Sequence, residues 1–499
     1  MARTKGGKVK KAKKGNLGKK LPRPFIKSPS RVIVKFHGTV ELPGKGAVHK
    51  HLEPKAGPWS QLIKKFPKIT IRRLFKTPQL KQVCNLVEDT KAKAKEIGCA
   101  YDPPNFRNTC VVQCPSGINS QKVAKELASW RTVKVAYVAS KSTRPPLVNN
   151  PGQNPEFARA EMDFLRPAPV GIDAEYAWKI PGGDGGGKEG IALQFLDLEQ
   201  GWTIDHEDLP RGIKRIYGAN QDWEGHGTSV LSIVVGNDNT KGAIGIAPNV
   251  ATIKVASIWQ SDGEDINRYE ALNAAINELT WGDVLLLEDQ ITARGNYPVN
   301  RGGYSATDGW GKYHKLPIEV DDTLFELIWT ATTRGIVVVE AAGNGDIDLD
   351  RFEPSESTYW RHADSGAIMV AGATDADPHR VHTPSNFGSR INCYAWSQSI
   401  FCAGDGKRGT SQRAYSPPYF SGTSAAAAII AGAALAFQGI AQANNLRPAN
   451  HKGRLAPKEL RQILSDPTTG TPSGDPPNDR IGVMPDLKSI IRKYVLGAP

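Results

Sequence analysis

Short apolar runs that alternate with helical stretches constrain the fold of the C-terminal two thirds of this chain. Runs of four to eight mainly apolar residues, such as 191–196, 284–287 and 336–340, are separated by segments of helical pattern. Strands that are apolar along their whole length are buried on both faces, which is typical of a parallel sheet covered by helices on both sides. The sequence therefore predicts an α/β domain over residues 171–499.

A smaller α+β unit is predicted ahead of this domain, at residues 31–140. Its four strand patterns lie at 31–36, 69–75, 108–114 and 131–138. Helical stretches separate these patterns, and the clearest of them runs over 119–130. The order approximates two βαβ units, which predicts a small ferredoxin-like fold.

Two segments without regular patterning flank this unit. Residues 1–30 are rich in Lys, Gly and Pro with almost nothing apolar, so we expect a disordered basic tail. Residues 141–170 contain several Pro and Gly breakers, among them Arg144-Pro-Pro, and are expected to form a linker.

The charge of the chain is divided between its two parts. Residues 1–168 carry 35 Lys and Arg against 10 Asp and Glu, whereas residues 169–499 carry 29 against 40. Such opposition is compatible with a nucleic-acid-binding arm, or with two parts that dock through complementary fields. The stretch Met1–Pro24 has ten basic and no acidic residues, so it could contact nucleic acid or anionic lipid. Because aromatic residues are not interleaved there, we favour a solubilising tail.

Cysteine usage and targeting signals give a weak indication of compartment. No Cys-x-x-Cys pair or His cluster accompanies the six cysteines, so a zinc site is not expected. Cys393 and Cys402 could close a short disulfide loop. No Sec signal is recognised, and no apolar run approaches the roughly 20 residues that span a bilayer. We therefore favour free thiols and a cytoplasmic or non-classically exported protein.

Three segments of the α/β domain carry the residue types of nucleophilic catalysis. Asp197 is predicted to end a buried strand, while His226 and Ser424 each open a predicted helix. A serine hydroxyl needs a positioned base, which His226 can supply, and Asp197 can orient the imidazole ring. Asp205 and Asp208 are alternative carboxylates, but neither ends a strand. The sequence thus predicts an Asp197–His226–Ser424 triad.

A fourth segment supplies a group that stabilises an oxyanion. The strand pattern at 336–341 runs into a tight turn that carries Asn344. The Asn344 amide and the backbone N–H of Ser424 are predicted to form an oxyanion hole, in which one donor contributes about 3–4 kcal/mol of transition-state stabilisation.

These four segments resemble the Asp, HGTxV, AAGN and GTSxA motifs of the subtilisin-like serine protease family (subtilases, peptidase family S8), in the family's order and over residues 170–440. The resemblance implies a subtilisin-like three-layer domain that hydrolyses proteins or peptides through an acyl-enzyme, with no cofactor required. It also implies an N-terminal prodomain that inhibits the site until it is cleaved. The unit at 31–140 resembles such a prodomain in position, size and topology, and cleavage is expected within 139–170.

The sequence departs from the family's motifs at several positions. Glu199 stands where the family usually has Gly, two residues after the predicted catalytic Asp197. The family's following His-Pro-Asp-Leu resembles His206-Glu-Asp-Leu209, but two extra residues precede it, so Gly201 is expected to take the glycine's role. Ala428 replaces a Pro that usually follows the nucleophile.

The segment that usually pairs with substrate backbone is also replaced, here by Leu287-Glu-Asp-Gln290. Glu288 and Asp289, with Gly343, are therefore candidate substrate-binding residues. Carboxylates at the S1 wall would favour basic substrate side chains, although carboxylates turned to solvent or paired internally fit the sequence equally well.

The acidic and basic residues allow two further interpretations. The acidic segment 346–350 invites a calcium site, but without further oxygen ligands we favour a solvated loop and expect no metal in catalysis. A nucleic-acid-binding protein with this fold would need a basic C-terminal domain, which is acidic here. A peptide-binding pseudoenzyme would lack part of the catalytic set. We therefore interpret the chain as a serine endopeptidase that processes itself.

Overall fold

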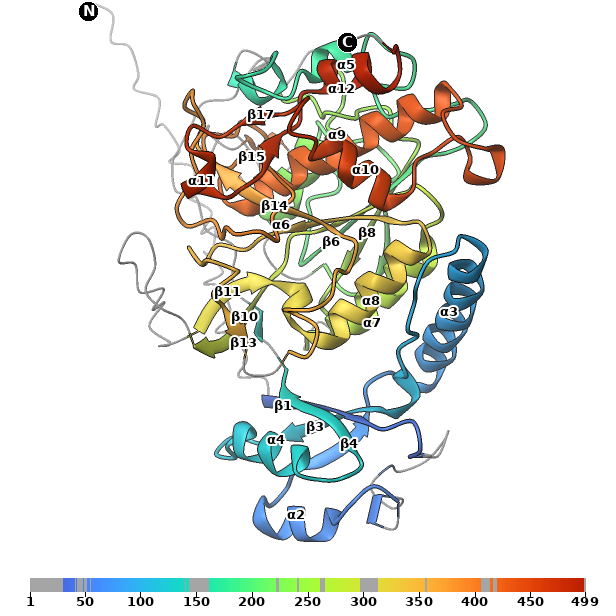
Figure 1. The fold of residues 1–499 in the computed structure, drawn as a ribbon, viewed down its shortest axis with the longest axis vertical. Helices are drawn as coiled ribbons and strands as arrows, with labels where there is room; N and C mark the ends of the chain where they lie inside the picture. The colour runs from blue at the N-terminus through green and yellow to red at the C-terminus, as the bar shows by residue number, and fades with distance from the viewer. Residues whose placement is uncertain are drawn as a thin grey trace, which may run out of the picture.

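The computed structural model describes residues 30–497 apart from several short stretches. Those stretches are 41, 43–47, 49–51, 54, 140, 143–160, 221–223, 240–241, 261–264, 297–312, 355–356, 405–412 and 416–419. The predicted tail before Ser30 and residues 143–160 of the predicted linker thus lie outside the described residues. Figure 1 shows a small N-terminal unit, in blue and cyan, against a larger domain coloured from green to red.

A nine-stranded sheet forms the centre of the larger domain, in the order β17-β18-β15-β14-β12-β9-β6-β8-β7. Its strands are β6 (Gln194–Glu199), β7 (Lys214–Tyr217), β8 (Thr252–Ser257), β9 (Val284–Leu287), β12 (Val337–Ala341), β14 (Ile368–Ala373), β15 (Cys393–Trp396), β17 (Thr471–Pro472) and β18 (Val483–Met484). All neighbouring pairs are parallel except β17 with β18. The predicted mainly parallel sheet is confirmed.

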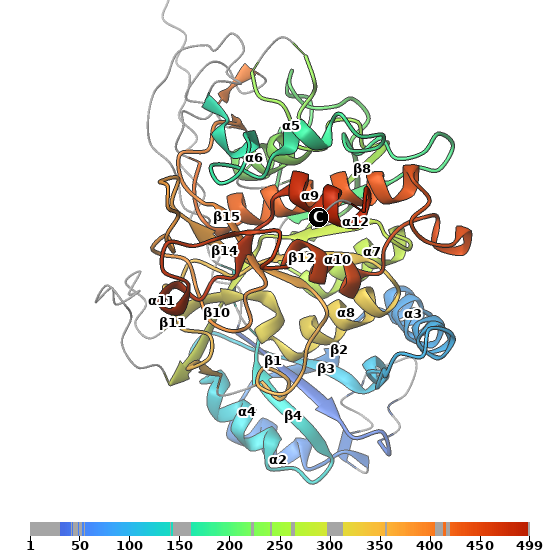
Figure 2. The same ribbon diagram turned by 45° about the horizontal axis from the view of Figure 1, so that its top comes forward.

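Helices cover both faces of this sheet (Figures 1 and 2). Helices α6 (Glu224–Val235) and α9 (Thr423–Ala443) pack against each other on one face, while α7 (Arg268–Glu278) and α8 (Asp322–Thr333) pack on the other. The shorter helices are α5 (Ala174–Ala177), α10 (Pro457–Leu464), α11 (Pro476–Asp479) and α12 (Leu487–Tyr494). By length and composition α9 could cross a bilayer, but its apolar window is wholly buried within the domain. It is therefore the core helix of the domain.

The small unit is a four-stranded antiparallel sheet in the order β2-β3-β1-β4. Its elements are β1 (Ser30–Phe36), α2 (Trp59–Lys65), β2 (Thr70–Arg73), α3 (Thr77–Glu96), β3 (Thr109–Cys114), α4 (Ser120–Ala128) and β4 (Val133–Val138). This order interleaves two βαβ units, as the sequence predicts. Helix α3 is an addition between them, and it packs against α7 and α8 of the larger domain.

Alternation along β1 explains how the small unit meets the larger domain. Val32 and Val34 pack into the unit's own core, whereas Ile33 joins the large hydrophobic cluster of the α/β domain. Lys35 points to the same side as Ile33, because successive side chains of a strand alternate between faces. Its Nζ lies 2.8 Å from Glu326 Oε2 of α8, and both groups are buried. The contact joins the basic part of the chain to the acidic part.

A second, smaller sheet lies beside the carboxyl end of β9. It consists of β10 (Gln290–Asn296), β11 (Tyr313–Pro317), β13 (Glu353–Pro354) and β5 (Lys141–Ser142). Strand β5 follows the small unit in the chain and pairs antiparallel with β10, with Ser142 opposite Ile291. The chain therefore passes from the small unit directly to the edge of β10.

All six cysteines are free thiols in this structure, and five of them are buried. Cys393 and Cys402, which the sequence allows to pair, are both among the free thiols. Burial raises the pKa of Cys110 to about 12, so this thiol is protonated and unreactive at neutral pH.

A fully buried ion pair anchors the segment after α9, and its loss is predicted to be costly. Arg454 Nη1 lies 2.7 Å from Asp283 Oδ1, and neither side chain is exposed. The test uses a chain in which Ser424→Ala removes the predicted nucleophile. In that chain, Arg454→Met leaves the Asp283 carboxylate buried without its cation. We expect urea denaturation to show a loss of about 3–5 kcal/mol in the free energy of unfolding.

The matched control is Arg361→Met, since Arg361 pairs with Glu353 on the surface, where the two side chains are 47% and 61% exposed. It should cost less than about 1 kcal/mol. Equal losses in the two variants would contradict the assigned importance of the buried pair.

Candidate active site

Strand β6 extends two residues beyond the end that the sequence suggests. It runs to Glu199, which pairs with Ser257 of β8. Because side chains two apart on a strand share a face, Asp197 and Glu199 point to the same side of the sheet, with Glu199 nearer the carboxyl edge. Helix α6 begins at that edge and carries His226 in its first turn.

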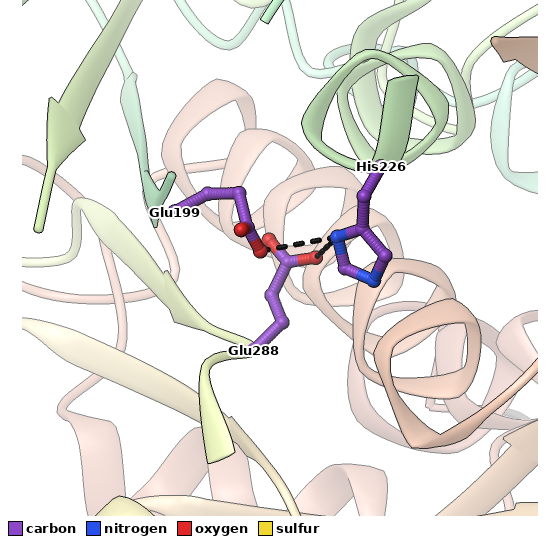
Figure 3. Close-up of side chains that lie close together, drawn as sticks. All are labelled: Glu199, His226 and Glu288. Carbon is purple, nitrogen blue, oxygen red and sulfur yellow. Dashed lines mark ion pairs between the residues drawn. The ribbon is translucent and has the colours of Figure 1, made fainter. Parts of the chain in front are cut away.

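Glu199 is the carboxylate that meets the imidazole of His226. Glu199 Oε2 lies 3.1 Å from His226 Nδ1, and Glu288 Oε2 lies 3.9 Å from the same nitrogen (Figure 3). Asp197 instead accepts a hydrogen bond from Trp202 Nε1, at 2.6 Å. The prediction that Asp197 orients His226 is thus not the arrangement in this structure, because β6 carries a second acid beyond Asp197.

The sequence holds a signal that identifies Glu199. Counted from Glu199 instead of Asp197, the two extra residues before His206-Glu-Asp-Leu209 disappear, and Gly201 falls two residues after the acid as the family's glycine does. The apparent insertion was therefore a change of residue type at the acid position. Reading the motif by spacing rather than by the letter Asp would have found it.

Asp197 and Glu288 form a buried pair of carboxyl groups behind the imidazole. Burial raises the pKa of Asp197 to about 6. Burial, followed by the neighbouring Asp197 charge, holds the pKa of Glu288 well above its usual range. Neighbouring buried carboxyl groups do not both ionise readily, which is why the pKa of each is raised.

Asp289 has a cation of its own. Its carboxylate forms an ion pair with Arg268 of α7, and both side chains are buried. Burial raises the Asp289 pKa, and the Arg268 charge opposes that rise. Glu288 and Asp289 both line the pocket that holds Ser424. Their burial nevertheless agrees with the alternative in which both carboxylates are paired within the protein, because neither of them is exposed to solvent.

Ser424 enters the site at the amino end of α9. It is the second residue of the helix, after Gly422 and Thr423, so its N–H has no partner within the helix. Gly422 has φ of 103°, a conformation that disfavours any side chain. Ser424 and His226 line one pocket with Glu199, Gln200, Glu288, Asp289 and Gln290. Neither Nδ1 nor Nε2 of His226 has a hydrogen-bond partner within the described part of the chain, so the contact with Glu199 is an ion-pair distance without hydrogen-bond geometry.

Asn344 lies in the turn after β12 with its amide held on two sides. Its Oδ1 accepts hydrogen bonds from Thr423 N at 2.9 Å and Thr423 Oγ1 at 3.3 Å. Its backbone N and Nδ2 donate to Gln290 Oε1 at 3.0 and 3.3 Å. Gly343 before it has φ of 89°, and a Cβ there would lie 2.9 Å from Asn386 Nδ2, so the turn requires glycine.

The other acidic candidates have structural partners. Asp208 is buried and accepts hydrogen bonds from Asn239 and Ala243, and burial raises its pKa to about 7. In the acidic segment 346–350, Asp348 and Asp350 both form ion pairs with Arg480. These carboxylates are engaged by a cationic side chain, which does not favour calcium ligation there.

Glu199, His226 and Glu288 also have donor atoms close enough together to hold a metal ion, within 4.8 Å of one another. A cation bound there would take the lone pair of His226 Nδ1. The nitrogen on the Ser424 side would then carry the proton and could not act as a base. Metal binding and base catalysis at His226 therefore exclude each other.

Comparison with known proteins identifies the family of this site. The model of the subtilase family matches residues 201–481. Subtilisin DY of Bacillus licheniformis is 26% identical over 252 residues, which are 50% of this chain and 77% of that protein. Subtilisin BL of Lederbergia lenta is 26% identical over 260 residues, 51% of this chain and 80% of that protein.

Solved structures agree with this fold. The epidermin leader peptide processing serine protease of Staphylococcus aureus matches 93% of this chain and 99% of its own, with a TM-score of 0.53 at 14% identity. Fervidolysin from Fervidobacterium pennivorans, described as a keratinolytic enzyme, matches 93% of this chain and 61% of its own, with a TM-score of 0.51 at 14% identity. The predicted three-layer fold is confirmed.

The raised pKa of Asp197 predicts a pH-dependent stability. Since the folded-state pKa of about 6 exceeds the unfolded value, the folded state holds the proton more tightly. The stabilisation is fully present below about pH 4 and is lost as the pH rises through about 6. Asp197→Asn cannot lose that proton. In the Ser424→Ala chain, its stability relative to the parent should rise by about 3 kcal/mol from pH 4 to pH 8.

Urea denaturation at intervals of half a pH unit measures this difference. Parallel stability curves for Asp197→Asn and its parent would show that Asp197 does not retain a proton in the folded state.

Proposed function

We propose that this chain, which belongs to the subtilase family of serine endopeptidases, cleaves peptide bonds with a Ser424–His226–Glu199 triad. The observation that carries the choice of acid is the 3.1 Å separation between Glu199 Oε2 and His226 Nδ1. A hydrogen bond from Gln200 N to Glu199 Oε1, at 2.8 Å, holds the carboxylate in place. Asp197 is then a neighbour of the triad and not a member of it.

The catalytic steps use Ser424, His226 and Glu199, which line one pocket, together with Asn344 in the turn after β12. Ser424 Oγ attacks the carbonyl carbon of the scissile bond while His226 Nε2 takes its proton, and Glu199 stabilises the imidazolium that forms. The negative oxygen of the tetrahedral intermediate is stabilised by Asn344 Nδ2 and the Ser424 N–H. His226 returns the proton to the departing amine, which leaves an acyl-enzyme. Water, activated by the same imidazole, then releases the second product and restores Ser424.

The surroundings of the neighbouring carboxyl groups support Glu199 as the acid of the triad. Asp289 has Arg268 as its cation, and burial raises the pKa of both Asp197 and Glu288. Glu199 is left as the carboxylate closest to His226 Nδ1. If Glu288 were deprotonated as well, a second negative charge would lie beside the imidazole.

We also propose that the unit at 31–140 is an inhibitory prodomain that the enzyme removes from itself. Strand β5, which follows this unit, pairs with β10 directly after Gln290 at the pocket. An extended peptide substrate would use the same backbone edge to add a strand. The attached segment therefore competes with substrate. The cleavage point expected within 139–170 falls mainly among residues outside those described.

The choice between the two acids predicts unequal losses of activity. Glu199→Gln should lower kcat by about 10⁴-fold, because an amide at this position favours the wrong imidazole tautomer. Asp197→Asn should lower kcat by less than about tenfold, because it leaves the acid beside Nδ1 unchanged. Initial rates on a fluorogenic peptide, with folded protein confirmed by circular dichroism, measure both. The opposite order of losses would return the catalytic role to Asp197.

Self-processing is tested by intact mass over time. The native chain should lose its N-terminal unit by cleavage within 139–170, while Ser424→Ala remains whole. If Ser424→Ala is cleaved at the same rate, the cut comes from another protease. If both chains stay whole and the native chain does not hydrolyse casein, the peptide-binding pseudoenzyme would replace this proposal.

A further inference from the structure

We propose that Gln290 is a positioning residue for the oxyanion hole, which fixes the orientation of the Asn344 amide during peptide hydrolysis. The inference rests on the proposed function, since it assigns a role within the same reaction. Gln290 lies where the family usually places a residue of the strand that binds substrate backbone. In this chain its side chain instead turns toward the amide that stabilises the oxyanion.

The hydrogen bonds around Asn344 leave its amide one orientation. Thr423 donates twice to Oδ1, which fixes the oxygen on the side of α9. Gln290 Oε1 accepts from the backbone N and from Nδ2 of Asn344, which fixes the nitrogen on the opposite side. An amide nitrogen carries two hydrogens. One of them binds Gln290, and the other remains available for the substrate oxygen.

The placement of Gln290 makes this clamp rigid. It is the first residue of β10, is buried, and has Pro317 of β11 as its ladder partner. The two residues before it are anchored elsewhere, Glu288 beside His226 and Asp289 on Arg268. Three successive residues thus connect the acid cluster, an ion pair and the oxyanion amide. Without these anchors, small movements of β10 would displace the Asn344 amide.

Loss of the clamp should affect turnover and not substrate binding. The oxyanion forms only as the carbonyl is attacked, so a misplaced donor weakens the transition state more than the ground state. Gln290→Met keeps the length of the side chain and removes the acceptor. We expect it to lower kcat by about tenfold while KM stays within about twofold.

A double-mutant cycle with Asn344→Ala separates positioning from general damage. Without the Asn344 amide there is nothing for Gln290 to orient. Gln290→Met should therefore cause no further loss of kcat in the Asn344→Ala chain. Rates are divided by the concentration of active sites, titrated with a serine-directed covalent inhibitor, so that unfolded protein does not contribute.

Gln438→Met is the matched control. Gln438 is a fully buried glutamine of α9 that makes two hydrogen bonds, both to the backbone of Leu455. Its loss should lower stability but leave kcat per active site near the native value, in both backgrounds. Gln290→Asn serves as a second variant if Gln290→Met does not fold, because it keeps the amide but withdraws the carbonyl by one methylene. Gln290→Asn should also lower kcat.

The outcomes are distinct. Coupled losses in Gln290 and Asn344 variants support the positioning role. Equal losses of kcat from Gln290→Met with and without Asn344 overturn it, and so does a gain of activity, which would mean that Gln290 obstructs the site. A native chain that hydrolyses no peptide, even after removal of its N-terminal unit, overturns the proposed function and this inference with it.

Discussion

The contact between one imidazole and one carboxylate, His226 and Glu199, at the carboxyl edge of the sheet is the constraint on which the proposed site depends. In a parallel sheet the carboxyl ends of all strands lie at the same edge, and the helices that follow begin there. Strand β6 therefore delivers Glu199 to the edge, β12 leads to Asn344, and α6 and α9 start there with His226 and Ser424. The groups of the proposed active site converge because the fold is parallel.

Pairing register explains the crowd of acids around His226. Strand β9 lies beside β6 with Leu287 opposite Leu198, so the next residues along the two strands, Glu288 and Glu199, emerge side by side. Buried carboxylates repel one another, and the structure removes their charges in different ways. Arg268 compensates Asp289, and burial raises the pKa of both Asp197 and Glu288, which opposes their ionisation. One acid is left to face the imidazole, which is what a triad requires.

The sequence predicts most of this arrangement from local patterns. The sheet follows from apolar runs, and His226, Ser424 and Asn344 follow from short motifs whose geometry is set by one turn of chain. The acid differs, because its identity depends on where β6 ends relative to its neighbours. The local pattern of β6 favoured Asp197, and only the spacing to His206 pointed to Glu199. The orientations of the Glu288 and Gln290 side chains cannot be predicted from the local sequence. They depend on the pairing of β9 with β6 and on packing against the turn after β12.

The contact between the two units gives a structural reason for the opposite net charges of the two parts of the chain. Lys35 reaches Glu326 from β1, and Tyr137 of β4 donates to Asp321 Oδ1 at the start of α8, at 2.9 Å. Both acceptors are buried, so these contacts are screened less by salt than exposed pairs are. The large basic excess of the N-terminal part, in contrast, resides mainly on exposed side chains and on residues before Ser30. The buried contacts determine the orientation in which the N-terminal unit docks. The exposed charge acts over a longer range and affects the rate of docking. Separation after cleavage would therefore require breaking the buried contacts, and raised salt alone would speed it only modestly.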